Sequence, residues 1–154
     1  MDDIIIARAI HILSVLFWIG GVAFVTLVVM PSIRGSTAPD DRLAAFHRIE
    51  GRFAPQARVW VVLAGVSGVW MIHRAQMWDR FAYPQFWWMH AMAALWAIFF
   101  AMLFLVEPLF LHRRMQNSPD LGRDFRRMER LHRILLLLGV VTVLGAAAGS
   151  HGLF

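Results

Sequence analysis

Histidine is the residue type that gives this sequence most of its metal chemistry. The chain has seven histidines and no cysteine. Zinc–thiolate sites, iron–sulfur clusters, disulfides and covalent c-type haem attachment are therefore excluded. Lysine is absent as well, so all 15 basic residues are arginine. Neutral imidazole is an ordinary axial ligand of haem iron, and the depth of each histidine in the fold decides whether that chemistry is available.

Membrane-spanning helices are the elements that must position these histidines. The composition is 59% hydrophobic and only 16% charged, with a mean hydropathy of +0.59, which excludes a disordered chain and disfavours a soluble domain. A spanning helix needs roughly 20 apolar residues. Stretches without Asp, Glu or Arg cover residues 9–33, 59–73, 81–106 and 134–154. We expect one all-α domain over residues 1–154, an integral membrane four-helix bundle with spans near 5–30, 54–73, 85–111 and 131–151.

The arginines predict the orientation of this bundle. Four spans put both termini on one side of the membrane, together with Arg8, Arg74 and Arg80. The other side has Arg34, Arg42, Arg48, Arg52, Arg58, Arg113, Arg114, Arg123, Arg126, Arg127, Arg130 and Arg133. By the positive-inside rule the arginine-rich loops are cytoplasmic, and the termini lie outside a bacterial-type inner membrane. Topology thus explains a pI near 11.4. We expect the protein to contact the lipid bilayer and not to bind nucleic acid. A homo-oligomer is an open alternative to a monomer.

Two histidines are expected inside the hydrocarbon at similar depth. His11 lies about two turns into the first span, and His90 follows the interfacial pair Trp87 and Trp88 in the third. Ionisable groups at this depth are costly and usually face the bundle interior. His11 and His90 are therefore the predicted axial ligands of a b-type haem. Arg8 and Arg74 are placed to bind its propionates.

Each span also has a face of small residues, which permits two interpretations. These faces include Ala93, Ala94, Ala97 and Ala101 beside His90, Gly21 beside His11, Ala64, Gly65 and Gly68 in the second span, and Gly139, Ala146 and Gly149 in the fourth. Close helix packing is the simpler interpretation. A flat macrocycle lying against the helices is the sharper one.

The remaining histidines, Glu107 and the helix starts also receive predicted roles or positions. His151 is a substitute or additional axial ligand, and His73 is interfacial. A second haem between two of His47, His112 and His132 is the alternative to three solvated histidines. Glu107 is expected to pair with Arg130 or Arg133. Helix starts are expected near 36–40 and at Ser118, with a kink at Pro55.

Two short motifs resemble a known group of membrane proteins. The segment from Arg8 to Leu13, followed by Phe17-Trp18-Ile19-Gly20-Gly21, resembles the opening helix of the HemJ and CopD-like superfamily. The segment Trp87-Trp88-Met89-His90-Ala91-Met92 is similar to the HemJ stretch of Trp, apolar residue, His, any residue and Lys, with Met92 in the lysine position. The resemblance covers roughly residues 5–140. It implies a four-helix membrane fold in which His11 and His90 bind haem.

These observations favour a haem b protein of membrane electron transfer or redox chemistry, with a quinone or a redox partner protein as its partner. If it is an enzyme, it is a haem-dependent membrane oxidoreductase. The alternatives are a HemJ-like protoporphyrinogen oxidase, a CopD-like copper transporter and a haem-free structural subunit of a membrane complex. The sequence predicts that His11→Ala and His90→Ala each abolish haem binding, whereas His112→Ala leaves it intact.

The orientation is tested by a reporter fused after Phe154. The arginine distribution predicts that a reporter active only outside the cytoplasm will be active at this position, and that one active only in the cytoplasm will be silent. A fusion after Arg34 is the matched control and should give the opposite pair of results. Cytoplasmic activity at Phe154 would invert the two layers of histidines.

Overall fold

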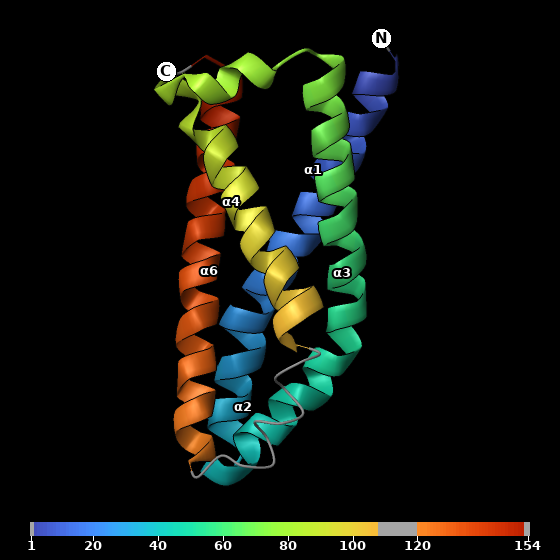
Figure 1. Cartoon of the computed structure of the whole chain (residues 1–154). Helices are drawn as coiled ribbons and strands as arrows, with labels where there is room; N and C mark the ends of the chain where they lie inside the picture. The colour runs from blue at the N-terminus through green and yellow to red at the C-terminus, as the bar shows by residue number, and fades with distance from the viewer. Residues whose placement is uncertain (1, 108–119, 153–154) are drawn as a thin grey trace.

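The computed structural model describes residues 2–107 and 120–152, which form helices and turns without a strand. Four long apolar helices are each able to cross a membrane: Asp2–Ser36, Pro39–Arg74, Pro84–Val106 and Leu121–Ser150. This confirms the prediction of a four-helix, multi-pass membrane protein. Figure 1 places the start of the first helix and the end of the last at one end of the bundle, called here the terminal end. The opposite end is called the arginine-rich end.

The described helical elements follow one another along the chain in this order. The first long helix consists of α1 (Asp2–Phe24), the π-helical turn η1 (Val25–Val29) and α2 (Met30–Ser36). The turn η2 (Pro39–Asp41) leads into α3 (Arg42–Arg74). Two 3₁₀ turns, η3 (Trp78–Ala82) and η4 (Pro84–Phe86), precede α4 (Trp87–Ala101) and its π-helical end η5 (Met102–Val106). The last helix is α6 (Leu121–Ser150).

Prolines explain the irregular turns of these helices. Pro31 has no N–H for the carbonyl of Leu27, and its ring would crowd that carbonyl in a regular α-helix. The wider π-helical turn η1, which ends at Val29, comes directly before it and relieves this conflict. Pro55 lies inside α3, and Figure 1 shows this helix bending in its first half, as the sequence predicts.

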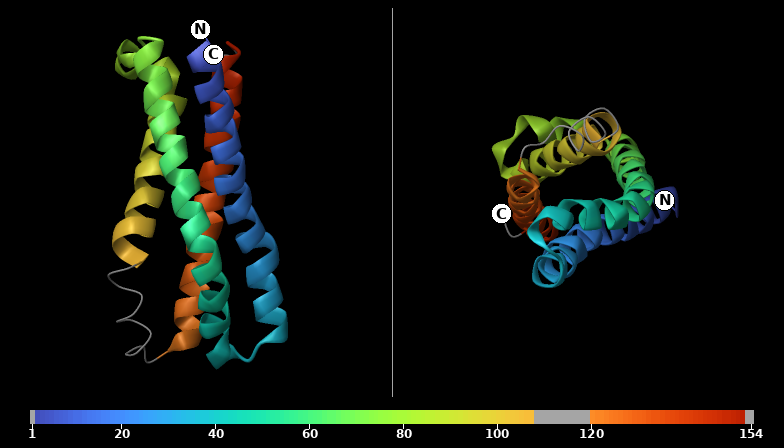
Figure 2. Two further views of the ribbon diagram at one scale, coloured as in Figure 1. Left: turned by 90° about the vertical axis from the view of Figure 1, so that its right-hand side faces the viewer. Right: turned by 90° about the horizontal axis from the view of Figure 1, so that it is seen from below.

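Two hydrophobic clusters hold the bundle together. The middle cluster joins all four helices through Trp18, Val22, Val61, Ala64, Leu95, Phe99 and Leu135. The cluster at the arginine-rich end joins the first, second and fourth long helices through Val25, Val29, Met30, Ile33, Phe46 and Phe125. In Figure 2, α4 ends well above the lowest turns of α3 and α6, which explains its absence from the second cluster.

The small residues of the spans seat aromatic side chains from neighbouring helices. A Cβ added at Gly65 would lie 2.6 Å from Nε1 of Trp96, which donates a hydrogen bond to the Val61 carbonyl at 2.8 Å. Gly145 contacts Trp87 and Gly149 contacts Trp88 in the same manner. These three glycines therefore leave room for indole rings, whereas other glycines of the spans contact Phe53, His11 or Ile19. Ala93, Ala94 and Ala97 are exposed, so this face of α4 does not point into the bundle.

The outward faces of the helices are strongly apolar. Large side chains such as Leu27 (65% exposed), Leu137 (65%) and Leu144 (64%) point away from the bundle. Lipid tails satisfy such a surface as well as a protein core does, whereas water does not. These apolar faces are therefore compatible with contact with a lipid bilayer.

The start of the last helix differs from the sequence-based expectation. Ser118 and Pro119, the predicted first residues, lie outside the described residues. The described helix starts at Leu121, and the carboxylate of Asp120 accepts a hydrogen bond from the Arg123 backbone N–H at 2.8 Å. Asp120 is a standard N-cap, because its side chain satisfies a backbone donor that has no partner within the helix.

The glycine-to-indole packing predicts opposite outcomes for two glycine variants. Gly65→Ala places a methyl group in the ring of Trp96, so we expect the free energy of unfolding to fall by about 1–3 kcal/mol. Gly20→Ala is the matched control, because no atom lies within 4 Å of its added Cβ. That variant should be neutral or slightly stabilising. Thermal unfolding in one mild detergent measures both, and equal effects would contradict this packing.

Candidate functional site

His11 lies between the first two long helices. Its Nδ1 is 2.9 Å from the Ala64 carbonyl oxygen and 3.2 Å from Oγ of Ser67, both on α3. A carbonyl oxygen only accepts hydrogen bonds, so Nδ1 must carry the proton. The neutral ring then has its lone pair on Nε2. This is the arrangement in which a histidine is oriented by a backbone carbonyl and offers Nε2 to a metal.

The surroundings of His11 are shaped around the imidazole. A Cβ on Gly68 would lie 3.2 Å from Cε1 of His11, so this glycine leaves room for the ring. Ser14, one turn further along α1, is fully buried and donates to the Ile10 carbonyl at 2.7 Å. Within the described part of the chain, no hydrogen bond is made by His11 Nε2. A metal-ligating lone pair is therefore available between the middle of the bundle and its terminal end.

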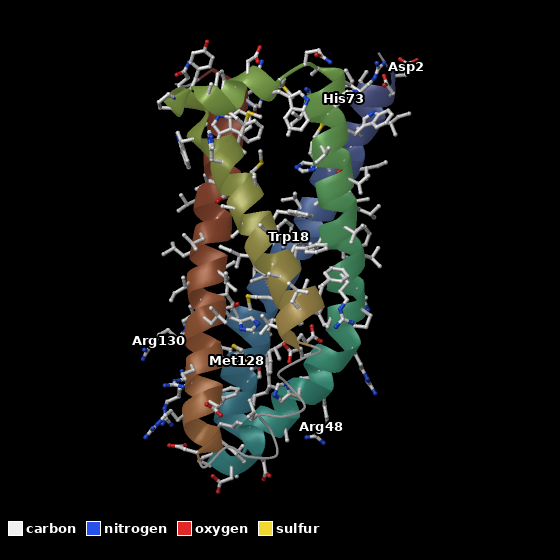
Figure 3. The ribbon with its side chains drawn as sticks, in the orientation of Figure 1. Asp2, Trp18, Arg48, His73, Met128 and Arg130 are labelled. Carbon is white, nitrogen blue, oxygen red and sulfur yellow. The ribbon has the colours of Figure 1, made fainter. Side chains whose placement is uncertain are left out.

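Two buried indole N–H groups also lack partners among the described residues. They belong to Trp18 and Trp88. Trp18 lies in the middle of the bundle (Figure 3), two turns beyond His11 on the same helix. A buried donor without an acceptor costs about 1–3 kcal/mol. Of the two, only Trp18 shares a helix with His11, because Trp88 is on α4 and packs against Gly149 of α6.

His90 has a different environment from His11. Its side chain is exposed, and its Nε2 is 3.0 Å from the Phe81 carbonyl oxygen, to which it must donate. The imidazole also packs edge-on against the Phe81 ring, with 5.2 Å between the ring centroids. The described structure thus does not bring His11 and His90 together. To offer Nε2 to iron, His90 would have to give up its bond to Phe81.

The other candidates at the terminal end are exposed. His151 is exposed, and its Nδ1 donates to the Ala147 carbonyl at 2.8 Å. Arg74, a predicted propionate partner, instead forms an ion pair with Asp3 at 2.6 Å, which joins the ends of α3 and α1. Arg8 is exposed on α1. His73 is exposed at the end of α3, as expected for an interfacial residue (Figure 3).

At the arginine-rich end, the structure brings two histidines to the same phenylalanine. Phe46, which is 1% exposed, packs edge-on against His47 of α3 at 5.8 Å and against His132 of α6 at 5.6 Å between ring centroids. His47 Nδ1 lies 2.8 Å from the Glu50 carboxylate, and His132 Nδ1 donates to the Met128 carbonyl at 3.0 Å. Both rings therefore leave Nε2 without a hydrogen bond to any described residue. His112, the third member of this layer, lies outside the described residues.

Glu107 pairs with a different arginine from the one expected. Its carboxylate lies 3.1 Å from the Arg58 guanidinium of α3, whose Nε also donates to the Leu103 carbonyl at 3.1 Å. Arg130 and Arg133, the partners predicted from sequence, are on α6. The bend of α3 at Pro55 turns its first half under α4 (Figure 1), and Arg58 follows directly after this bend.

The carboxylate that does contact Arg133 is Glu129, one turn earlier on α6. Its side chain is 8% exposed and lies 2.6 Å from Arg133 and 3.0 Å from Arg34 of α2. The contact with Arg34 ties the last helix to the end of the first, whereas the contact with Arg133 stays within α6. Glu129 was not predicted from the sequence, although its spacing of four residues from Arg133 is a recognisable ion-pair signal.

The described residues contain no group of three or more His, Asp or Glu side chains that is able to hold a metal ion. A haem needs only one or two axial ligands, so this finding leaves haem chemistry open. No protein-family model, no curated protein and no solved structure matches this chain. The site therefore has to be interpreted from its own geometry.

The Glu129 contacts predict a clear stability effect. Glu129→Gln removes the charge that two arginines share, and we expect the free energy of unfolding to fall by about 1–3 kcal/mol. Asp40→Asn, at an exposed position of η2, is the control and should change it by less than about 0.5 kcal/mol. Denaturation in detergent measures both variants, and a stable Glu129→Gln would show that the ion pairs contribute nothing.

Proposed function

We propose that this protein binds b-type haem in the membrane and works in membrane electron transfer or a related redox step. The observation that carries this proposal is His11. Its Nδ1–H is held by the Ala64 carbonyl, its Nε2 lone pair has no partner among the described residues, and it lies between two spans. Imidazole held in this way is an ordinary axial ligand in a helical bundle.

The residues around His11 have definable tasks towards a haem. His11 would hold the iron, while Ala64 and Ser67 fix its tautomer and ring orientation. The haem would supply a one-electron redox couple. The apolar middle cluster around Trp18 and Phe99 keeps water away, which tunes the potential of such a couple. Arg8, one turn before His11 and exposed, is the basic side chain available to a propionate, since Arg74 is paired with Asp3.

The sequence and the structure differ on which residue would be the second ligand of the haem iron. The sequence predicts His90 as the second ligand, with His151 as substitute. The geometry favours His11 as the single anchoring ligand, because His90 is exposed and bonded through Nε2. An open second position suits a haem that meets a substrate, as in the HemJ-like alternative. A filled one suits a pure electron carrier.

The finer assignments belong to this proposal as well. They are outward termini in a bacterial-type inner membrane, a quinone or redox partner protein as the reaction partner, and membership of the HemJ and CopD-like superfamily. The CopD-like copper transporter and the haem-free structural subunit are the competing functions. Both predict a colourless protein, so a visible spectrum separates them from the haem proposal.

The deciding experiment is the reduced-minus-oxidised spectrum, with the haem-to-protein ratio, of protein purified from haem-replete cells. We expect a pigment that acidic organic solvent extracts, because no cysteine is present to attach it. His11→Ala should empty the site, and His90→Ala should leave haem bound. His73→Ala, exposed at the same end, is the matched control.

Each other outcome has a distinct meaning. If His90→Ala also loses haem, the bis-histidine pair predicted from sequence is correct and the Phe81 bond breaks on haem binding. If haem survives His11→Ala but is lost in His47→Ala or His132→Ala, the haem lies at the arginine-rich end beside Phe46. A colourless, folded wild-type protein overturns the proposal. Turnover of a porphyrinogen would identify the HemJ-like activity.

A further inference from the structure

The first third of α6 has an arginine face that the bundle does not use. Arg123, Arg126, Arg127, Arg130 and Arg133 follow one another at spacings of three, one, three and three residues and are all exposed. These spacings place the five side chains within about a third of the helix circumference. The opposite face of the same segment buries Phe125 and Glu129 against the other helices. Figure 3 shows Arg130 pointing away from the bundle.

Three of these arginines have no carboxylate partner in the described part of the chain. Arg123 contacts the Asp120 carboxylate at 3.4 Å, and Arg133 contacts Glu129. No ion pair joins Arg126, Arg127 or Arg130 to a described residue. Uncompensated guanidinium groups this close together repel one another, so the face is more stable with an anion bound. Guanidinium binds phosphate oxygens through two parallel hydrogen bonds.

The same face of α6 continues as an apolar surface towards the terminal end. Ile134, Leu137, Val141 and Leu144 follow the arginines at spacings of three and four residues, and they are 48–65% exposed. The change from arginine to apolar side chains takes place between Arg133 and Ile134. This order along one helix face, first cationic and then apolar, matches a phosphate headgroup followed by acyl chains.

We propose that this face, Arg126, Arg127 and Arg130 with the apolar residues from Ile134 to Leu144, is a binding site for an anionic phospholipid. The phosphodiester would lie among the three arginines, and the acyl chains would lie along the apolar part of α6. The site is separate from the proposed haem site, because its named residues include neither His11 nor a member of the middle cluster. It would fix the depth and tilt of α6 in the bilayer.

The test is a lipid titration followed by native mass spectrometry of the detergent-solubilised protein. Phosphatidylglycerol and phosphatidylcholine with identical acyl chains are the two probes. We expect tighter binding of phosphatidylglycerol, and Arg126→Gln/Arg130→Gln should weaken it about 25-fold at low ionic strength. The effect should shrink as salt is added. Arg126→Lys/Arg130→Lys should restore part of the affinity, because the charge returns without the two-pronged geometry.

The matched control is Arg48→Gln/Arg52→Gln, which removes the same charge from exposed positions on α3. It should leave the binding of phosphatidylglycerol within about threefold of the wild-type value. An equal loss in both double variants would mean that anionic lipid responds only to net charge and would overturn the site. Equal binding of the two lipids, or full competition by inorganic phosphate alone, would also overturn it.

Discussion

A chain that crosses a bilayer must satisfy its polar groups without water, and this constraint organises the whole structure. Helices satisfy the backbone. Buried hydroxyl groups follow the same logic, because Ser14, Thr26, Ser67 and Thr142 each donate to the carbonyl one turn earlier in their own helix. His11 and Trp96 differ from these hydroxyl groups, since His11 Nδ1 and Trp96 Nε1 each find their acceptor on another span. The bond to Ala64 therefore fixes how α1 is rotated against α3.

The same constraint separates the two ends of the bundle. At the arginine-rich end, charged groups pair across helices, Arg34 with Glu129 and Arg58 with Glu107, while Arg133 pairs with Glu129 within α6. Water and headgroups are near enough there to solvate the exposed parts of these side chains. Towards the terminal end, indole rings seated on Gly145 and Gly149 fill the interior, and the ion pair of Arg74 with Asp3 lies at the helix ends. Aromatic residues fill this space without adding charges that the membrane would penalise.

Much of the architecture was predictable because it follows from composition and period. Charge-free stretches located the four spans, and Pro55 located the bend in α3. Arg58 was not predictable as the partner of Glu107. The sequence gives the position of the bend in α3, but it does not give the direction in which the helix bends. The environment of His90 was also missed. Sequence places it at the depth of a buried residue, but only the path of the η3 turn brings the Phe81 carbonyl to its ring. The small-residue faces were recognised, whereas their indole occupants depend on helix packing.

In such a bundle, the position of a histidine does not by itself decide its role. The hydrogen-bond partner of each ring nitrogen decides which nitrogen is open to a ligand. His90 uses Nε2 to satisfy a carbonyl that the turn between spans leaves open, and this makes it a structural residue in the described state. His11 satisfies its partner through Nδ1 and leaves Nε2 as a bare acceptor in an apolar region. Among the described residues, Trp18 and Trp88 add two buried N–H donors without acceptors. Unpartnered polar groups away from water cost stability. The open Nε2 of His11, more than the count of histidines, is the observation that favours the proposed haem site.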